Sequence, residues 1–330
     1  MFQVDYQYDK GGWQQPLITP YGPLKIETSA SCLHYGISHF EGVSIYKNQV
    51  NQIPQAIRVQ DTLDSFKNSA DRIDMPLFDT EELLKCLKMY VNHERHNFPQ
   101  IEDPKLVSQL YLRLVHISTY GILGIKQSKQ TKLYGIINPN VVENKSLKVI
   151  TSSGVSKSWP LGHGSFRLSG NIGCLSPAVQ EAKSLGYDDV LWMMDDYIQE
   201  LTDKNVYIYW QSRFGKKELV VPLDNGCIFN GLIRRSILDI KDEIKQSLDI
   251  DLVVRNISIH EIINASKERR LYELFASSQA TQIQSIEKLR FAERVVDLDQ
   301  NFAVANFVRQ KFIDIATSDI KPDWITKFEP

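Results

Sequence analysis

The sequence predicts an α/β protein built from two domains. The chain has 330 residues, about twice the roughly 150 residues of an average domain. Short strand-like runs separated by turns fill the part before residue 138, whereas strands and helices alternate after residue 147. The polar stretch 138–147 between these parts contains a proline. We therefore expect an N-terminal domain at 1–138, an interdomain linker at 139–147 and a C-terminal domain at 148–330.

The N-terminal part has one well-marked helix among strands. Asp79 predicts the start of this helix, because its side chain can cap the first turn while Glu82 completes a capping box. Leu83, Leu87 and Val91 then fall on one face at helical spacing. Apolar and β-branched runs predict core strands at 39–47, 111–117 and 132–137.

The C-terminal part shows clearer helix boundaries. Ser176 is predicted to cap a helix that has Pro177 in its first turn and ends before Gly186. Gly231 is predicted to open a long helix that continues to residue 248. A further helix is expected at 301–316, and strands are expected at 189–194 and 205–210.

Composition excludes several functional classes. With 38 basic and 40 acidic residues, the net charge of −2 argues against a basic nucleic-acid or membrane-surface binder. Four cysteines without a CxxC pair indicate reduced thiols in an intracellular compartment. No apolar run is long enough to span a membrane. His93 and His96 have no third ligand nearby in sequence, so we expect no metal site.

Some segments occur in an order and spacing that are not generic. They are LHYGISHFEGVSIYK at 33–47, NSADRIDMP at 68–76, FRLSGNIGCLSPAVQEAKSLGYDDVLWMM at 166–194 with IQELTDKNVYIYW at 198–210, and NGLIRRSIL at 230–238. Together they resemble the branched-chain amino acid aminotransferases, a class IV family that uses pyridoxal phosphate (PLP). The resemblance runs nearly from end to end.

This resemblance implies fold type IV, with a small N-terminal α/β domain and a larger C-terminal domain. It also implies an active site between the domains that a dimer partner completes. The family reaction is transamination of branched-chain amino acids with 2-oxoglutarate as amino acceptor, in the mitochondrial matrix or the cytoplasm, with the matrix preferred. That chemistry needs a lysine that forms an imine, a carboxylate for the ring nitrogen, a phosphate cradle and donors for the substrate carboxylate.

The most consequential departure from the family pattern is Arg167, which stands at the lysine position. A guanidinium stays protonated in proteins and cannot become an imine nucleophile. Other cofactor positions have changed as well: Ser65, Gln279, Ile172, Leu232 and Ile233 stand where the family has an arginine, a threonine, a tyrosine, a valine and a threonine. The resemblance therefore implies that none of the catalytic residues is intact.

A second group of residues keeps the family pattern: Glu200 at the ring-nitrogen position, Tyr111 and Arg113 on the substrate side, Tyr35 and Phe40 in the partner-facing loop, and Gly231 at the phosphate turn. Each also has a structural explanation. Tyr35 and Phe40 can serve packing, and Arg113 can form an ordinary ion pair. Glu200 can be a polar strand end, and Gly231 can be only a helix entry.

The joint losses favour a pseudoenzyme. In this hypothesis the protein is a branched-chain aminotransferase-like structural or interaction subunit of a larger assembly, without an expected cofactor. It would form a homodimer, or a heterodimer with a paralogue. Two alternatives stay open. A working PLP transaminase would need a relocated amine, and we nominate Lys204, beside the expected ring. A non-catalytic sensor would bind a keto acid or another small anion through Arg113, Arg167 and the helix start at Gly231.

Overall fold

The chain forms two compact units in the computed structural model, which describes residues 1–103, 106–152 and 154–329. Unit 1 comprises Met1–Val142, Phe166–Gly170 and Ile313–Pro330, and unit 2 comprises Glu143–Ser165 and Asn171–Phe312. The predicted α/β class is confirmed. The C-terminal tail and the segment around Arg167 belong to unit 1, so the second unit is not the continuous stretch 148–330 that we expected.

Unit 1 is built on an antiparallel sheet with the strand order β18-β5-β4-β6-β7-β1-β2. Its strands are β1 (Phe2–Gln7), β2 (Gly12–Trp13), β3 (Leu17–Ile18), β4 (Ser38–Lys47), β5 (Pro54–Ile57), β6 (Val107–Ser118), β7 (Gln130–Val142) and β18 (Ile325–Lys327). Strand β7 pairs with the whole of β6, from Thr131 opposite Ser118 to Val142 opposite Val107. Residues 139–142 of the predicted linker therefore belong to β7, and only 143–146 connect β7 to the next strand.

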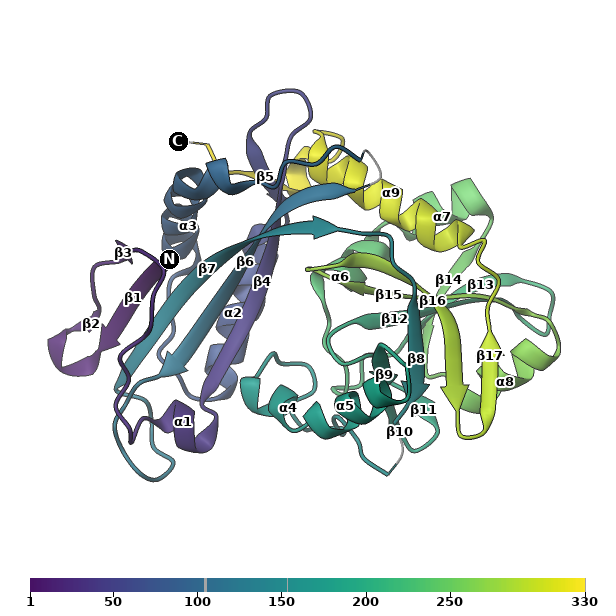
Figure 1. Cartoon of the computed structure of the whole chain (residues 1–330), viewed down its shortest axis with the longest axis horizontal. Helices are drawn as coiled ribbons and strands as arrows, with labels where there is room; N and C mark the ends of the chain where they lie inside the picture. Colours follow the sequence, from purple (N-terminus) through teal and green to yellow (C-terminus); the bar gives the residue numbers. More distant parts are fainter. Residues whose placement is uncertain (104–105, 153, 330) are drawn as a thin grey trace. The chain divides into compact units, whose positions relative to one another are not determined.

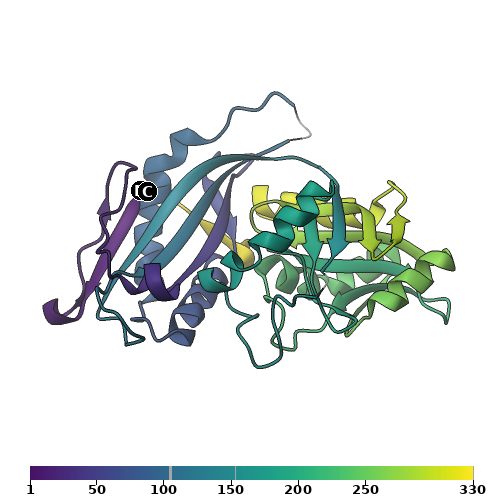
Figure 2. The same ribbon diagram turned by 60° about the horizontal axis from the view of Figure 1, so that its bottom comes forward.

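Helices α2 (Val59–Arg72) and α3 (Thr80–Glu94) pack on one face of this sheet (Figures 1 and 2). Leu63 and Phe66 on α2 and Leu87 on α3 are fully buried against the sheet. The Asp79 carboxylate caps α3 as predicted and accepts from the Glu81 and Glu82 amides. Short helices η1 (Tyr8–Lys10), α1 (Ser31–Tyr35), η2 (Arg95–Asn97) and η3 (Pro322–Trp324) complete the unit.

Unit 2 contains a mixed sheet with the order β14-β13-β12-β15-β16-β8-β9. Its strands are β8 (Leu147–Thr151), β9 (Asp189–Leu191), β12 (Asn205–Gln211), β13 (Lys217–Pro222), β14 (Asp251–Arg255), β15 (Leu271–Ser278) and β16 (Gln282–Phe291), with β17 (Arg294–Asp297) paired to β16; β10 (Met193–Met194) and β11 (Tyr197–Ile198) form a separate ribbon. The pairs β13–β14, β8–β16 and β8–β9 are parallel. Aliphatic side chains such as Val206, Ile208 and Leu274 fill the core on one face.

The helices of unit 2 correct two predictions. The helices are α4 (Ser169–Gly173), which crosses the unit boundary, α5 (Ser176–Ser184), α6 (Leu232–Asp239), α7 (Lys241–Leu248), α8 (Ile259–Lys267) and α9 (Ala303–Thr317), whose last turn belongs to unit 1. The long helix expected after Gly231 is broken at Ile240, whose side chain is buried, so core packing overrides helix propensity. Ser176 does not cap α5, because the chain enters α5 almost directly from α4 through Leu175.

Candidate functional site

Arg167, at the expected lysine position, lies beside strand β4 in unit 1. The Phe40 amide donates to the Arg167 carbonyl at 3.1 Å, and Leu168 bridges to His39. The Arg167 Nε atom is 3.4 Å from Glu41 Oε1, and their side chains are 17% and 4% exposed. The position that needs a neutral amine therefore holds a partly buried guanidinium paired with a carboxylate. A guanidinium stays protonated in proteins, and the neighbouring carboxylate stabilises its charge.

A second arginine shares the same aromatic ring. The Arg113 guanidinium lies 4.5 Å from the centroid of Phe40 and 5.6 Å from that of Tyr111. The Arg167 guanidinium is 6.0 Å from the Phe40 ring. Phe40, Gly42 and Tyr111 come together because β4 and β6 pair with Gly42 opposite Arg113. Gly42 leaves room for the Tyr111 ring, since an added Cβ would lie 2.1 Å from the Tyr111 hydroxyl.

Tyr35 and Ser65 are the remaining predicted site residues of unit 1. Tyr35 ends α1, is 41% exposed and accepts the Gly124 amide on its hydroxyl at 2.6 Å. Ser65 lies on α2, where its carbonyl accepts the Ser69 hydroxyl. Among the described residues, no contact given by the structure joins either of them to the Arg167 group, so the sequence prediction of their roles stays a prediction.

Glu200 is the centre of a buried polar network in unit 2. Its carboxylate accepts Lys157 Nζ at 2.8 Å, Asn205 Nδ2 at 3.2 Å and the Phe229 amide at 3.2 Å. The Lys157 and Glu200 side chains are 7% and 2% exposed. A buried charge pair of this kind is sustained by such additional hydrogen bonds.

Lys157 is the residue that sequence reasoning missed. Besides Glu200, its ammonium donates to the carbonyls of Leu201 at 3.3 Å and Thr202 at 2.8 Å. All three donor positions of the ammonium are thus used inside unit 2. The lysine stands in a polar loop far from Glu200 in sequence, and no spacing signal connects the two.

The two segments of unit 2 that were expected to bind the cofactor phosphate are the start of α6, which is apolar, and the turn between β15 and β16, which forms hydrogen bonds within itself. Gly231 precedes α6 in an extended conformation, and an added Cβ would lie 2.8 Å from Asn205 Oδ1. Leu232 and Ile233, which follow it, are buried. Gln279 lies in the turn between β15 and β16. In that turn the Ser278 hydroxyl bonds the Thr281 hydroxyl at 2.9 Å and accepts the Thr281 amide at 3.3 Å.

Ile172 and Lys204 complete the predicted set. Ile172 packs against the small apolar cluster around Leu175 and Trp192. Lys204 Nζ is 2.6 Å from Asp203 Oδ1 and 3.7 Å from Asp189 Oδ2. Burial by itself lowers the pKa of Lys204, but the two carboxylates outweigh burial and hold this pKa above its ordinary value. An imine-forming lysine needs the opposite shift, so the geometry disfavours Lys204 as a relocated amine.

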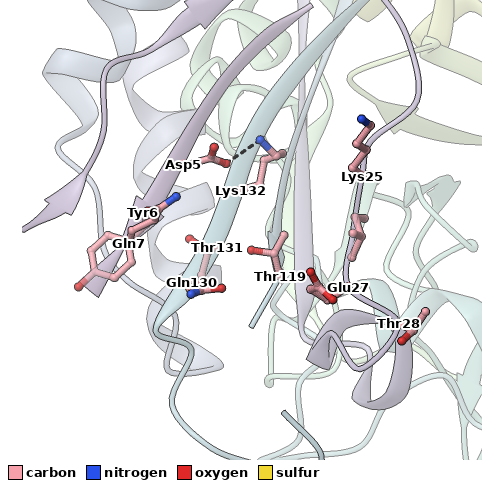
Figure 3. Close-up of a pocket in the computed structure, with 11 residues that line it drawn as sticks. Asp5, Tyr6, Gln7, Lys25, Glu27, Thr28, Thr119, Gln130, Thr131 and Lys132 are labelled. Carbon is pink, nitrogen blue, oxygen red and sulfur yellow. Dashed lines mark ion pairs between the residues drawn. The ribbon is translucent and has the colours of Figure 1, made fainter. Parts of the chain in front are cut away.

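Other features of the described residues do not add a site. No group of three or more histidine, cysteine, aspartate or glutamate side chains in residues 1–103, 106–152 and 154–329 could hold a metal ion. Within the same residues, no helix is long and apolar enough to cross a membrane. A polar hollow of about 380 Å³ opens on unit 1 (Figure 3), where Lys132 pairs with Asp5 at 2.6 Å. None of the predicted site residues lines this hollow.

Comparison with known proteins decides the family. No family model matches the chain. A probable branched-chain-amino-acid aminotransferase of Staphylococcus epidermidis is 32% identical over 309 residues, which cover 91% of this chain and 82% of the relative. The chain belongs to the branched-chain aminotransferase family. The Dictyostelium discoideum enzyme is 31% identical, covering 88% of this chain and 76% of the enzyme. The cytosolic mouse enzyme is 28% identical, covering 95% of this chain and 82% of the enzyme.

Solved structures show the same fold for this branched-chain aminotransferase-like protein. The Thermobaculum terrenum enzyme superimposes with a TM-score of 0.77 at 15% identity, covering 99% of this chain and 97% of the enzyme. The Escherichia coli enzyme gives a TM-score of 0.73 at 17% identity, covering 93% of this chain and 94% of the enzyme. The predicted fold type IV is confirmed. Another branched-chain amino acid aminotransferase of this fold was solved with pyridoxamine 5′-phosphate, which makes PLP the cofactor to test against the residues of this chain.

Proposed function

We propose that this branched-chain aminotransferase-like protein is a pseudoenzyme that serves as a structural or interaction subunit. The observation that carries the proposal is Arg167, which stands at the imine-forming position and is paired with Glu41. A charged guanidinium cannot attack an aldehyde, so the covalent attachment that holds PLP in a transaminase is lost.

The rest of the cofactor site supports the same conclusion. Ser65 cannot supply the charge-assisted bond that an arginine gives a phosphate, a bond that contributes about 1.5–3 kcal/mol. In the turn at Gln279, the Thr281 amide donates to the Ser278 hydroxyl of the same turn. The start of α6 offers buried Leu232 and Ile233 but no hydroxyl. These residues do not fit PLP as a covalently held cofactor.

The buried network around Glu200 supports a retained scaffold. Lys157, Asn205 and the Phe229 amide satisfy the Glu200 carboxylate within unit 2. The buried Glu200 carboxylate is therefore stabilised by hydrogen-bond donors of the chain itself. We propose that the family fold persists for its surfaces, in a homodimer or in a heterodimer with a paralogue. Its compartment stays a prediction, since relatives carry both cytosolic and mitochondrial names.

A spectroscopic experiment tests the loss of catalysis. The full chain is purified with added PLP, and its visible spectrum is recorded before and after borohydride, followed by peptide mapping. We expect no trapped adduct and no transamination of leucine with 2-oxoglutarate. Arg167→Lys alone should restore neither. The matched variant combines Arg167→Lys with Ser65→Arg and Gln279→Thr. It restores the imine-forming amine together with two of the lost phosphate contacts. An adduct on Lys204 or Lys157 with turnover would refute the proposal.

A separate measurement tests the subunit role. Native extracts are fractionated by size, and the protein is located with an antibody. Migration in an assembly larger than a dimer, retained after a high-salt wash, is expected. Migration entirely as a free dimer would contradict the structural role while leaving the loss of catalysis untouched.

One observation favours a second function, the binding of a small anion. Two guanidinium groups, those of Arg113 and Arg167, flank the Phe40 ring, and Glu41 is the carboxylate paired with Arg167. This excess of positive charge favours a carboxylate ligand such as a keto acid. Calorimetry with 2-oxoglutarate should then show saturable binding that Arg113→Gln abolishes. Binding that is equal in Arg113→Gln would remove this alternative.

A further inference from the structure

Two histidines that the candidate site does not use face each other inside unit 1. His39 on β4 and His116 on β6 are opposite each other in the register and are fully buried. His39 Nε2 lies 3.1 Å from His116 Nδ1, and His116 Nε2 lies 2.8 Å from Thr131 Oγ1 on β7. The imidazoles and the hydroxyl thus form one hydrogen-bonded chain across three strands.

Aromatic rings enclose this chain. Phe66 of α2 is 4.4 Å from the His39 ring, while Trp13 of β2 is 5.5 Å and Phe78 is 6.1 Å from the His116 ring. The contacts connect strands β4 and β6 to β2 at the edge of the sheet, to α2 and to the segment before α3. The histidine pair is therefore part of the packing that holds these elements together.

The charged groups near the pair are already matched with each other. Glu41 lies two residues along β4 on the same face and pairs with Arg167. Asp5 and Lys132 lie on the opposite face of β1 and β7 and pair in the polar hollow of Figure 3. The residues that α2 buries on this side are apolar or hydroxyl side chains, and Tyr6 of β1 stands opposite Thr131. No hydrogen bond or ion pair to a carboxylate is given for either imidazole in the described residues.

The hydrogen bonds of the two imidazoles indicate which ring nitrogens carry the protons. His39 Nδ1 is buried and has no hydrogen-bond partner among the described residues. An unpaired buried N–H is costlier than an unpaired lone pair, so we assign Nδ1 as the unprotonated nitrogen. His39 Nε2 then donates to His116 Nδ1, and His116 Nε2 donates to Thr131. An added proton would place an N–H at His39 Nδ1 with no acceptor, or would break the bond between the rings.

We infer that the His39–His116 pair is an acid-sensitive contact, neutral in the folded chain, whose protonation loosens Trp13, Phe66 and Phe78 from strands β4 and β6. The inference is independent of whether the protein catalyses a reaction. It concerns only how unit 1 responds to the acidity of its surroundings.

The direction of the pH effect follows from the environment. Burial lowers the pKa of His39 to about 3, and burial together with the neighbouring His39 holds the pKa of His116 well below its ordinary value. The unfolded chain binds these protons near pH 6.5, whereas the folded chain does not. Stability from the pair is therefore complete above pH 6.5 and falls as the pH decreases. Between pH 7.5 and 5.5 each histidine raises the unfolding constant about tenfold, so the pair raises it about 100-fold.

The test compares unfolding at pH 7.5 and pH 5.5. Urea unfolding of the full chain is followed by hydrogen exchange of β4 and β6 peptides in the wild type and in His39→Leu/His116→Leu. From pH 7.5 to pH 5.5 the unfolding constant of the wild type should rise about 100-fold more than that of the double variant. The matched control is His93→Leu/His96→Leu, which alters two exposed histidines of α3 and η2 and should retain the wild-type pH dependence.

The wild type alone provides a second readout if the double variant does not fold. Histidine ring ¹⁵N chemical shifts should show both imidazoles neutral at pH 5.5, with Nδ1 of His39 unprotonated. Titration of either ring near pH 6.5 in the folded chain would overturn the inference. An identical pH dependence in the wild type and the double variant would overturn it as well.

Discussion

Lys157 gives the sharpest test of the polar network in unit 2. Replacing it with methionine keeps most of the side-chain volume but removes the ammonium that pairs with Glu200 at 2.8 Å. The carboxylate is 2% exposed, so water cannot replace the lost partner. Truncating one partner of a buried ion pair typically costs about 3–5 kcal/mol, because the remaining charge stays desolvated. The Leu201 and Thr202 carbonyls lose a donor too.

Hydrogen exchange of the central strand β12 measures this loss, because its amides report the opening of unit 2. At about 1.36 kcal/mol per factor of ten, Lys157→Met should accelerate exchange of these amides by roughly 10²- to 10⁴-fold. Lys157→Met/Glu200→Gln should exchange more slowly than Lys157→Met, since it removes both charges. Lys245→Met, at an exposed pair with Asp249 in the same unit, is the control and should leave exchange unchanged.

Two results would refute the reasoning. If Lys157→Met accelerated β12 exchange less than tenfold, the ion pair would not be buried as the geometry indicates. If the double variant were less stable than Lys157→Met by the full effect of Glu200→Gln, the two side chains would act independently and would not form a pair.

The remaining predictions concern packing and helix caps. Gly42→Ala places a methyl group against the Tyr111 ring and should cost about 1–3 kcal/mol, visible as a lower urea midpoint and altered near-UV circular dichroism; an unchanged spectrum would contradict the close approach. Glu273→Ala should cost about 2 kcal/mol, measured as faster exchange at the start of α9, because two amides of its first turn lose their buried acceptor. Asp79→Ala should expose the first turn of α3 to faster exchange. Hydrogen bonds from the Glu82 and Glu81 amides hold the pKa of Asp79 below its usual 3.8, so the stability from this cap is present at neutral pH and is lost as the pH falls below about 4; a wild type and variant that differ equally at pH 7 and pH 2.5 would contradict this.

Local signals predicted the parts of the fold that depend on short stretches of chain. Asp79 marks the start of α3 because an aspartate side chain can reach amides two and three residues away. The apolar run at 111–117 predicted β6, which the structure extends to Val107–Ser118. The linker was predicted too long, because residues 139–142 are held as strand by pairing with β6, a contact that no local pattern reveals.

For the candidate site too, the sequence located some residues and missed others. The resemblance to the family located the substituted lysine position at Arg167 and the retained carboxylate at Glu200, because both residues lie inside segments that match the family. Sequence spacing did not predict Lys157, which reaches Glu200 from a loop 43 positions away. It did not predict that Lys204 would be held charged by Asp189 and Asp203 either.

The sequence by itself therefore determined the family, the fold type and the absence of a lysine at residue 167, since these follow from residue identities in a fixed order. Only the tertiary structure decided which charged groups pair, Glu41 with Arg167 and Lys157 with Glu200, and it brought His39 within hydrogen-bond distance of His116. The physical reason is that charge and proton affinity depend on burial and on distances of a few ångströms. Those distances are set by strand register and loop closure between residues that lie far apart along the chain.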